Sequence, residues 1–147
     1  MEHRETLRDP MVWSGAIAAV LIHAWVFFVG EYLPYIDWSN HVGLAALFGS
    51  GGPYTDRSLL PTPYLLFYAF TAILGHLVGV VAAAKLALLA STFLFTFGAA
   101  FLAESTGRDP RLGLIAPLAL FGTNLGWGFA SFLFAMPLML FVFAWTE

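Results

Sequence analysis

Four long stretches of this chain carry no charged side chain, and they limit what it can fold into. They cover residues 10–30, 58–84, 86–103 and 112–146. A helix needs about 20 apolar residues to cross the roughly 30 Å hydrocarbon core of a bilayer. The first and third stretches therefore fit one crossing helix each. At about 1.5 Å per residue, the fourth is too long for a single crossing.

Charge is scarce as well as clustered. Apolar residues make up 60% of the chain and charged residues 10%, whereas a soluble domain has about 45–50% and 25%. The formal net charge of −3 argues against a surface for nucleic acid. There is no cysteine, so neither a disulfide nor a thiolate metal site can form. The composition predicts an all-α fold, a polytopic transmembrane helical bundle, in a single transmembrane domain over 1–147.

The fourth stretch breaks at 122–128, where glycines and Asn124 interrupt the helical pattern. Pro117 and Pro137 should kink the two helices that result. The first stretch is longer than the roughly 7–15 apolar residues of a signal peptide and lacks an A-x-A-like cleavage site, so it indicates an uncleaved anchor. The predicted spans are 11–30, 82–103, 112–125 and 127–145.

The stretch 58–84 decides the topology. It can span the bilayer, or the segment 60–79 can lie along the outer interface, where amphipathic rings such as those of Tyr64, Tyr68 and His76 concentrate. An interfacial segment leaves four of the six Lys and Arg residues inside, and a spanning segment leaves three. The positive-inside rule favours the first. The prediction is a cytoplasmic N-terminus and an outer loop, 31–80, that carries short juxtamembrane helices.

The tripeptide Arg-Asp-Pro occurs twice, at 8–10 and at 108–110, each time before an apolar stretch. Asp is a good helix N-cap, and Pro is favoured at the first helical position. This repeat predicts helices that begin at Pro10 and Pro110. Its arginines place both starts on the cytoplasmic side.

The candidate chemistry lies in the polar part of the outer loop. Ser39 or Asn40 can cap a short helix over about 40–48. If the helical turn includes Asp37, its carboxylate and the His41 imidazole lie at i and i+4, on one face.

The stretch Asp-Trp-Ser-Asn-His at 37–41 resembles the D-x-x-N-H pattern of bacterial GT-C membrane glycosyltransferases. The stretch Gly-Trp-Gly-Phe-Ala-Ser-Phe-Leu at 126–133 resembles a W-G-F segment that recurs in those proteins. An Asp in the first outer loop, before a juxtamembrane helix, is the hallmark of that family. The resemblance covers essentially the whole chain but only the N-terminal part of such an enzyme. The chain is therefore expected to be a fragment that is inactive alone.

The resemblance implies transfer of a sugar from a polyprenyl-phosphate donor to an acceptor outside the bacterial plasma membrane. In such enzymes the loop Asp, here Asp37, is the general base, and His41 lies beside it. A basic residue at the outer start of the next membrane helix often holds the lipid phosphate. Lys85 occupies that place, where the family often has Arg, and Asn40 is a second candidate for substrate binding.

Each of these residues also has a plainer interpretation. Asp37 can be a loop acid or a helix cap, His41 a structural histidine, and Lys85 a side chain that snorkels to the interface. No cofactor is predicted: Asp37 and His41 could join a divalent-metal site, but two ligands do not make one. His23, inside the first span, is either functional or hydrogen-bonded to a neighbouring helix.

Two other classes of protein compete with the enzyme. One is a small non-catalytic helical membrane protein, acting as a subunit or scaffold. The other is a transporter fragment, which finds little support because no predicted span carries the paired charges that mark ion paths. The expected partners are the lipid bilayer and a polyprenyl-phosphate-linked sugar, with no nucleic acid. Nothing in the sequence indicates an oligomeric state.

Overall fold

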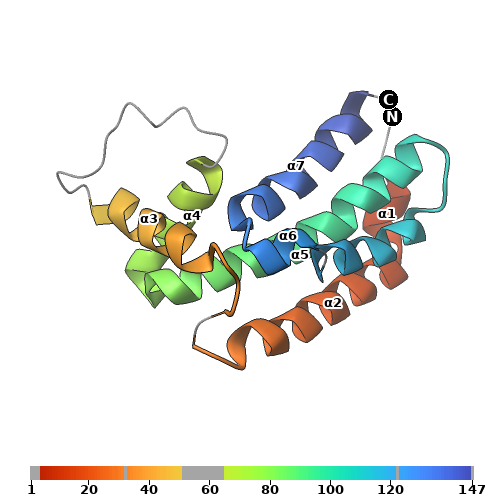
Figure 1. Cartoon of the computed structure of the whole chain (residues 1–147). Helices are drawn as coiled ribbons and strands as arrows, with labels where there is room; N and C mark the ends of the chain where they lie inside the picture. Colours follow the sequence, from red (N-terminus) through yellow and green to blue (C-terminus); the bar gives the residue numbers. More distant parts are fainter. Residues whose placement is uncertain (1–3, 32, 51–64, 122, 147) are drawn as a thin grey trace.

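The computed structural model describes residues 4–31, 33–50, 65–121 and 123–146, and within them every regular element is helical (Figure 1). The all-α prediction is confirmed for this part of the chain. The elements are α1 (Arg4–Arg8), α2 (Pro10–Phe28), α3 (Trp38–Ser50), α4 (Leu65–Val78), α5 (Val80–Ser105), the 3-10 helix η2 (Pro110–Phe121), α6 (Thr123–Trp127) and α7 (Ala130–Thr146).

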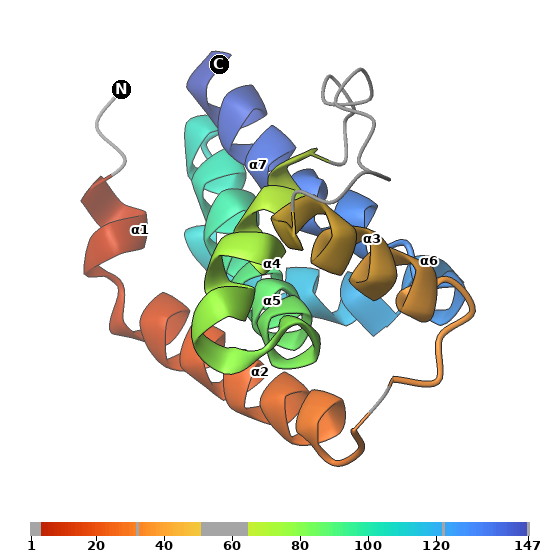
Figure 2. The same ribbon diagram turned by 90° about the vertical axis from the view of Figure 1, so that its left-hand side faces the viewer.

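Helix α5 is the centre of the fold, and α2 runs antiparallel to it. The ring of Trp13, near the start of α2, lies 4.7 Å from that of Phe97, in the second half of α5. Just past the end of α2, the Gly30 carbonyl accepts a hydrogen bond from Lys85, in the first half of α5. Figure 2 shows α2 passing beneath α5. Both ends of α2 are therefore tied to opposite ends of α5.

The chain then returns along α5 twice more. Gly113 of η2 packs on the α5 backbone at Thr96 and Ala100, and Leu120 belongs to the core that surrounds Leu88, so η2 is antiparallel to α5. Helix α7 is parallel to α5, since Phe141 meets the ring of Phe101 at 5.5 Å. Four segments, namely α2, α5, η2 with α6, and α7, thus lie side by side.

By length and composition, two of these helices could cross a membrane: α2 with 19 residues and α5 with 26. The apolar helices α4 and α7, with 14 and 17 residues, fall short of that length. The predicted span 112–125 is for the most part a 3-10 helix. Pro117 lies inside it and has no amide hydrogen, so it donates no helical hydrogen bond there. A 3-10 helix rises about 2.0 Å per residue, so its 12 residues cover about 24 Å.

Both copies of the Arg-Asp-Pro repeat begin helices, as predicted. The Asp9 side chain accepts a bond from the Met11 amide at 2.7 Å, and Asp109 accepts one from the Arg111 amide at 2.9 Å. The two copies meet, since Arg111 Nε lies 2.8 Å from Asp9 Oδ2. The hydrogen bond from Arg111 holds the pKa of Asp9 below its usual value. We call this the repeat end of the bundle.

Helix α1 is fastened to the repeat end through Glu104, in the last turn of α5. The Glu104 carboxylate accepts bonds from the backbone amides of Glu5 and Thr6, at 3.1 and 3.2 Å, and from the Thr6 hydroxyl. Helix α1 and the α5–η2 turn are therefore neighbours.

Helices α3 and α4 pack against each other at the opposite end, where α5 begins (Figure 1). We call this the loop end, and it also contains Gly30 and the α6–α7 turn. The predicted short helix over 40–48 exists, but it begins at Trp38, so the expected cap at Ser39 or Asn40 is wrong. Asp37 precedes the helix instead, and its carbonyl accepts the first helical bond, from the His41 amide at 3.1 Å. That is the N-cap position, for which Asp is well suited.

Candidate functional site

Asp37 lies where the chain turns into α3, and the turn after α6 holds it there. The backbone amides of Ile36 and Asp37 donate to the carbonyls of Gly126 and Trp127, at 3.4 and 2.9 Å. The two segments that carry the family resemblance, 37–41 and 126–133, are therefore in direct contact. Nearly ninety residues separate them in the sequence, so only the fold brings them together.

Gly128 makes that contact possible. Its φ of +81° belongs to the region that glycine adopts at no steric cost. A Cβ at this position would lie 2.8 Å from the backbone nitrogens of both Asp37 and Trp38. Backbone atoms cannot rotate away as a side chain can. The turn therefore requires glycine for two independent reasons, and it fixes the position of the Asp37 backbone.

The Asp37 carboxylate is half-buried and accepts a hydrogen bond from Asn40 Nδ2 at 3.2 Å. An anion at the first turn of a helix is stabilised by the helix dipole. The structure thus brings together two of the predicted site residues, Asp37 and Asn40. It also shows that Asp37 is the N-cap residue of α3, which is the structural role that the sequence analysis gave as the alternative to catalysis.

His41 extends the site toward α4. Its Nδ1 lies 2.9 Å from the hydroxyl of Tyr68, and its ring meets that of Phe67 edge-on at 6.0 Å. Burial lowers the pKa of His41, and the negative charge of Asp37 opposes this shift. Sequence reasoning placed Tyr68 only among the interfacial aromatic residues. No local pattern could have paired it with a histidine 27 positions earlier.

The lowered pKa of His41 predicts that acid weakens the fold. Above its ordinary pKa of 6.5, the folded and unfolded chains both hold it neutral, so its contribution does not change with pH. As the pH falls below 6.5, the unfolded chain takes up the proton first, and the free energy of unfolding decreases until the pH reaches the lower pKa of the folded state. The melting temperature, measured between pH 7.5 and 5, should therefore fall less in His41→Gln than in the parent. Ser39→Gln, at an exposed position of α3 that carries no titratable group, is the control and should keep the parent's slope. Equal slopes in all three proteins would contradict this assignment.

Lys85 has partners different from those expected. Its ammonium donates to the Gly30 carbonyl at 2.5 Å and lies 5.2 Å from the centre of the Phe28 ring, while the residue is only 3% exposed. A cation is stabilised near the C-terminus of a helix, and here it ties the end of α2 to α5. The cavity beside it, about 460 Å³, is lined by Glu31 and by the α4–α5 turn. A general base and a phosphate-binding cation that act on one substrate would be expected to line the same cavity. Asp37 does not line the cavity beside Lys85, so the structure does not place the two side chains in one cavity there.

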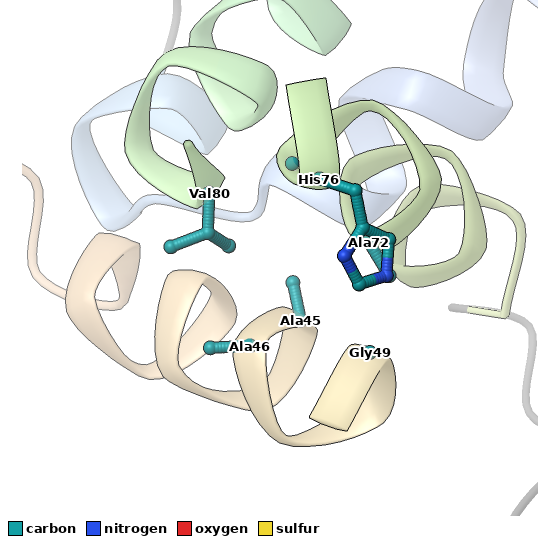
Figure 3. A pocket seen from close by; sticks show the side chains of 7 residues that line it. Ala45, Ala46, Gly49, Ala72, His76 and Val80 are labelled. Carbon is teal, nitrogen blue, oxygen red and sulfur yellow. The ribbon is translucent and has the colours of Figure 1, made fainter. Parts of the chain in front are cut away.

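A second cavity, about 240 Å³, lies between α3 and α4 (Figure 3). Its walls are mostly small residues, and His76 stands beside it. A Cβ on Gly49 would lie 3.2 Å from that of Ala72, and one on Gly75 would lie 3.3 Å from Val80 Cα. The small side chains therefore let α3, α4 and the start of α5 approach closely. None of the predicted site residues lines this cavity.

The remaining predicted position is His23, buried in the middle of α2. Its Nδ1 lies 2.7 Å from the carbonyl of Ala19 in the same helix, and its ring meets Phe27 at 5.7 Å. Within the described residues, no group of three or more His, Asp or Glu side chains gathers around a point where a metal could bind. The chemistry open to the loop end is therefore that of Asp37, Asn40, His41 and Tyr68.

Comparisons with protein-family models, with curated proteins and with solved structures gave no match. The geometry of the loop end is thus the basis for assigning a function. It consists of a half-buried carboxylate at a helix start, an imidazole one turn further on that contacts Tyr68, and a glycine turn that fixes the Asp37 backbone.

Proposed function

We propose that this chain is a polytopic membrane protein whose four side-by-side segments cross a bilayer, with the loop end outside. The support is the exposed surface of the bundle, which is apolar on α2 and α7. Leu21 is 65% exposed, Trp25 74% and Trp145 87%. Exposing such surface to water costs about 25 cal/mol per Å² of apolar area, a cost that lipid removes.

The 3-10 geometry of η2 supports the same proposal. As an α-helix, its 12 residues would rise about 18 Å, whereas the 3-10 form rises about 24 Å. The five residues of α6 add about 7 Å. The two together match the roughly 30 Å of hydrocarbon. The charged residues of the repeat end would then lie in the cytoplasm, at the start of α2 and of η2.

The chain has no native cysteine, so the topology can be tested with single-cysteine variants. Ser39 in α3 and Thr106 after α5 are both exposed. A membrane-impermeant maleimide on intact cells should label Ser39→Cys, and it should label Thr106→Cys only after the cells are permeabilised. Labelling at 106 without labelling at 39 would overturn the orientation.

We further propose that the loop end is part of the active site of a glycosyltransferase in the bacterial plasma membrane, which uses a polyprenyl-phosphate sugar. The observation that carries this proposal is the contact between segments 37–41 and 126–133, the two that resemble GT-C enzymes. The glycine turn that joins them also leaves the Asp37 carboxylate half-exposed to a substrate.

In the proposed reaction, an acceptor hydroxyl oxygen attacks the anomeric carbon of the donor sugar. The bond from that carbon to the phosphate oxygen breaks, and its electron pair leaves with the lipid phosphate. Asp37 takes the hydroxyl proton, and Asn40 holds the carboxylate in place. His41 stabilises the site from the α4 side. The phosphate contact that the resemblance implies for Lys85 would require its ammonium to leave the Gly30 carbonyl and to reach beyond its own cavity, which Asp37 does not line, so Lys85 is given no step in this reaction.

A non-catalytic scaffold is the second candidate, and particular bonds favour it. Asp37 occupies the N-cap position of α3, and the Lys85 ammonium links the end of α2 to α5. Both residues therefore have a structural role that requires no substrate. In a scaffold, replacing Asp37 would change stability and nothing else. The two candidates therefore differ in whether the protein transfers a sugar at all, and in whether replacing Asp37 abolishes that transfer.

The direct test is a transfer assay in membranes from cells that produce the native protein, compared with a strain that lacks its gene. The probes are polyprenyl-phosphate hexoses and pentoses with a radiolabel on the sugar. Transfer of label to a product that depends on the gene is the expected result. If no donor gives gene-dependent transfer, the enzyme proposal fails and the scaffold remains.

A further inference from the structure

Two exposed aromatic side chains flank Gly128 at the loop end. Trp127 is 49% exposed and Phe129 is 40% exposed. Their ring planes lie within 15° of parallel, with centroids 6.5 Å apart. The pair therefore presents two flat faces of nearly the same orientation, on a turn between α6 and α7. We call these two residues the aromatic pair.

The backbone of the aromatic pair is held at a fixed distance from Asp37. The Trp127 carbonyl accepts the Asp37 amide at 2.9 Å, and the neighbouring Gly126 carbonyl accepts the Ile36 amide at 3.4 Å. Gly128, between the two rings, is so close to the Asp37 backbone that no Cβ would fit. The turn is closed as well by the Gly128 amide on the Leu125 carbonyl at 2.9 Å. An aromatic surface and a carboxylate are thus parts of one rigid unit.

The ligand class that needs both features is a saccharide. One face of a pyranose ring is formed by C–H groups, which carry slight positive charge and pack on the negative face of an aromatic ring. The hydroxyl groups point outward from the ring edge, where a carboxylate and an amide can bind them. Asp37 and Asn40 supply these two groups beside the turn.

We propose that the aromatic pair is the binding surface for the acceptor, and that the acceptor is a saccharide. This rests on the proposed function, and it narrows the acceptor to a sugar hydroxyl. The backbone bond between Asp37 and Trp127 keeps the two segments adjacent, so a sugar ring bound on the aromatic pair is proposed to present a hydroxyl to the Asp37 carboxylate. Exposed tryptophans also serve as anchors at the membrane interface. An anchor, however, needs no fixed position relative to a carboxylate, whereas this turn has one.

The test measures binding without any donor, so that it does not depend on turnover. The full chain is reconstituted in phosphatidylcholine nanodiscs, since alkyl-glycoside detergents would themselves present sugars. The probes are neutral disaccharides, with the open-chain polyol sorbitol as the chemical control. Saturation-transfer NMR should show saturation at the ring C–H protons of at least one disaccharide and none for sorbitol. Trp127→Ala and Phe129→Ala should each weaken binding about tenfold, which is the upper range for an aromatic contact.

Matched variants separate the proposal from its rivals. Trp145→Ala removes a more exposed tryptophan from the other end of α7 and should leave disaccharide binding unchanged. Trp127→Phe keeps a ring and should retain most of the binding, so that a folding defect in Trp127→Ala is recognised. The alternative, in which Trp127 is an anchor at the membrane interface, is tested with phosphatidylcholine that has brominated acyl chains, because bromine quenches the fluorescence of a tryptophan that lies in the lipid. The chain has five tryptophans, so the signal of Trp127 is taken as the fluorescence that Trp127→Phe removes. Strong quenching of that fluorescence, together with no saturation of any disaccharide, would show a membrane anchor and overturn the proposal.

The catalytic proposal is judged by a separate variant. Asp37→Asn should keep disaccharide binding, because the aromatic pair is intact, while sugar transfer is lost. If Asp37→Asn both binds the disaccharide and transfers sugar at the full rate, Asp37 has no catalytic role, and the proposed binding surface at the aromatic pair is retained. Transfer lost in Asp37→Asn with no disaccharide bound by the parent would overturn the aromatic pair alone.

Discussion

Replacing Asp37 with asparagine is expected to lower the rate of sugar transfer by about 10²–10⁴-fold, the contribution of a positioned general base. An acceptor hydroxyl has a pKa far above neutral, so it must lose its proton as the new bond forms. Asparagine has nearly the same shape as aspartate but cannot accept that proton. The measurement is the initial rate of label transfer in membranes from cells that produce the native protein, with and without the substitution, at equal amounts of protein.

The same substitution should have little effect on the fold. Asparagine is as good an N-cap as aspartate, so α3 should keep its start, and the bonds to the α6–α7 turn involve only the Asp37 backbone. Glu5→Gln is the matched control, because Glu5 is an exposed carboxylate at the repeat end, away from the proposed site, and only its backbone amide binds Glu104. An equal loss of transfer in both variants, or full transfer in Asp37→Asn, would rule out the general-base role.

Much of the fold could be predicted because its signals are local. The uncharged stretches gave the positions of α2, α5 and α7, since helix length and apolarity are properties of neighbouring residues. The Arg-Asp-Pro repeat gave two helix starts, because an N-cap and a first-turn proline act within one turn. The glycines around 126–128 gave the break before α7. What remained was how these pieces meet.

The contacts of the candidate site depend on how the helices pack against one another, and no local sequence pattern predicts that packing. Lys85 was expected to hold the donor phosphate or to snorkel to the interface, but the end of α2 lies within its reach, and the Gly30 carbonyl, 55 positions earlier, accepts a hydrogen bond from its ammonium. The contact between His41 in α3 and Tyr68 in α4 likewise depends on the packing of two helices. The 3-10 form of η2 was also missed. Pro117 could be seen in the sequence, but the close contact of Gly113 with α5 could not.

Gly113→Ala is expected to destabilise the protein strongly, because the added methyl group would meet the backbone of another helix. A Cβ at Gly113 would lie 2.5 Å from the Thr96 carbonyl oxygen, 2.7 Å from the Ala100 amide nitrogen and 2.8 Å from Ala100 Cβ. Two of these atoms belong to the α5 backbone, so η2 itself must move. Overpacking a core usually costs about 1–3 kcal/mol. Because the backbone cannot yield, we expect the free energy of unfolding to fall by about 3 kcal/mol, the upper end of that range.

The control for Gly113 is Gly43→Ala, in the exposed part of α3, where a Cβ would meet nothing within 4 Å. Alanine is favoured over glycine in a helix by up to about 1 kcal/mol, so this variant should be as stable as the parent or slightly more so. Thermal unfolding of the three proteins in the same nanodiscs gives the comparison. Small residues let membrane helices approach closely, so the loss at Gly113 should be accompanied by a shift of η2 away from α5. A Gly113→Ala protein as stable as Gly43→Ala would mean that η2 is free to move, and that its packing on α5 does not hold the four segments together.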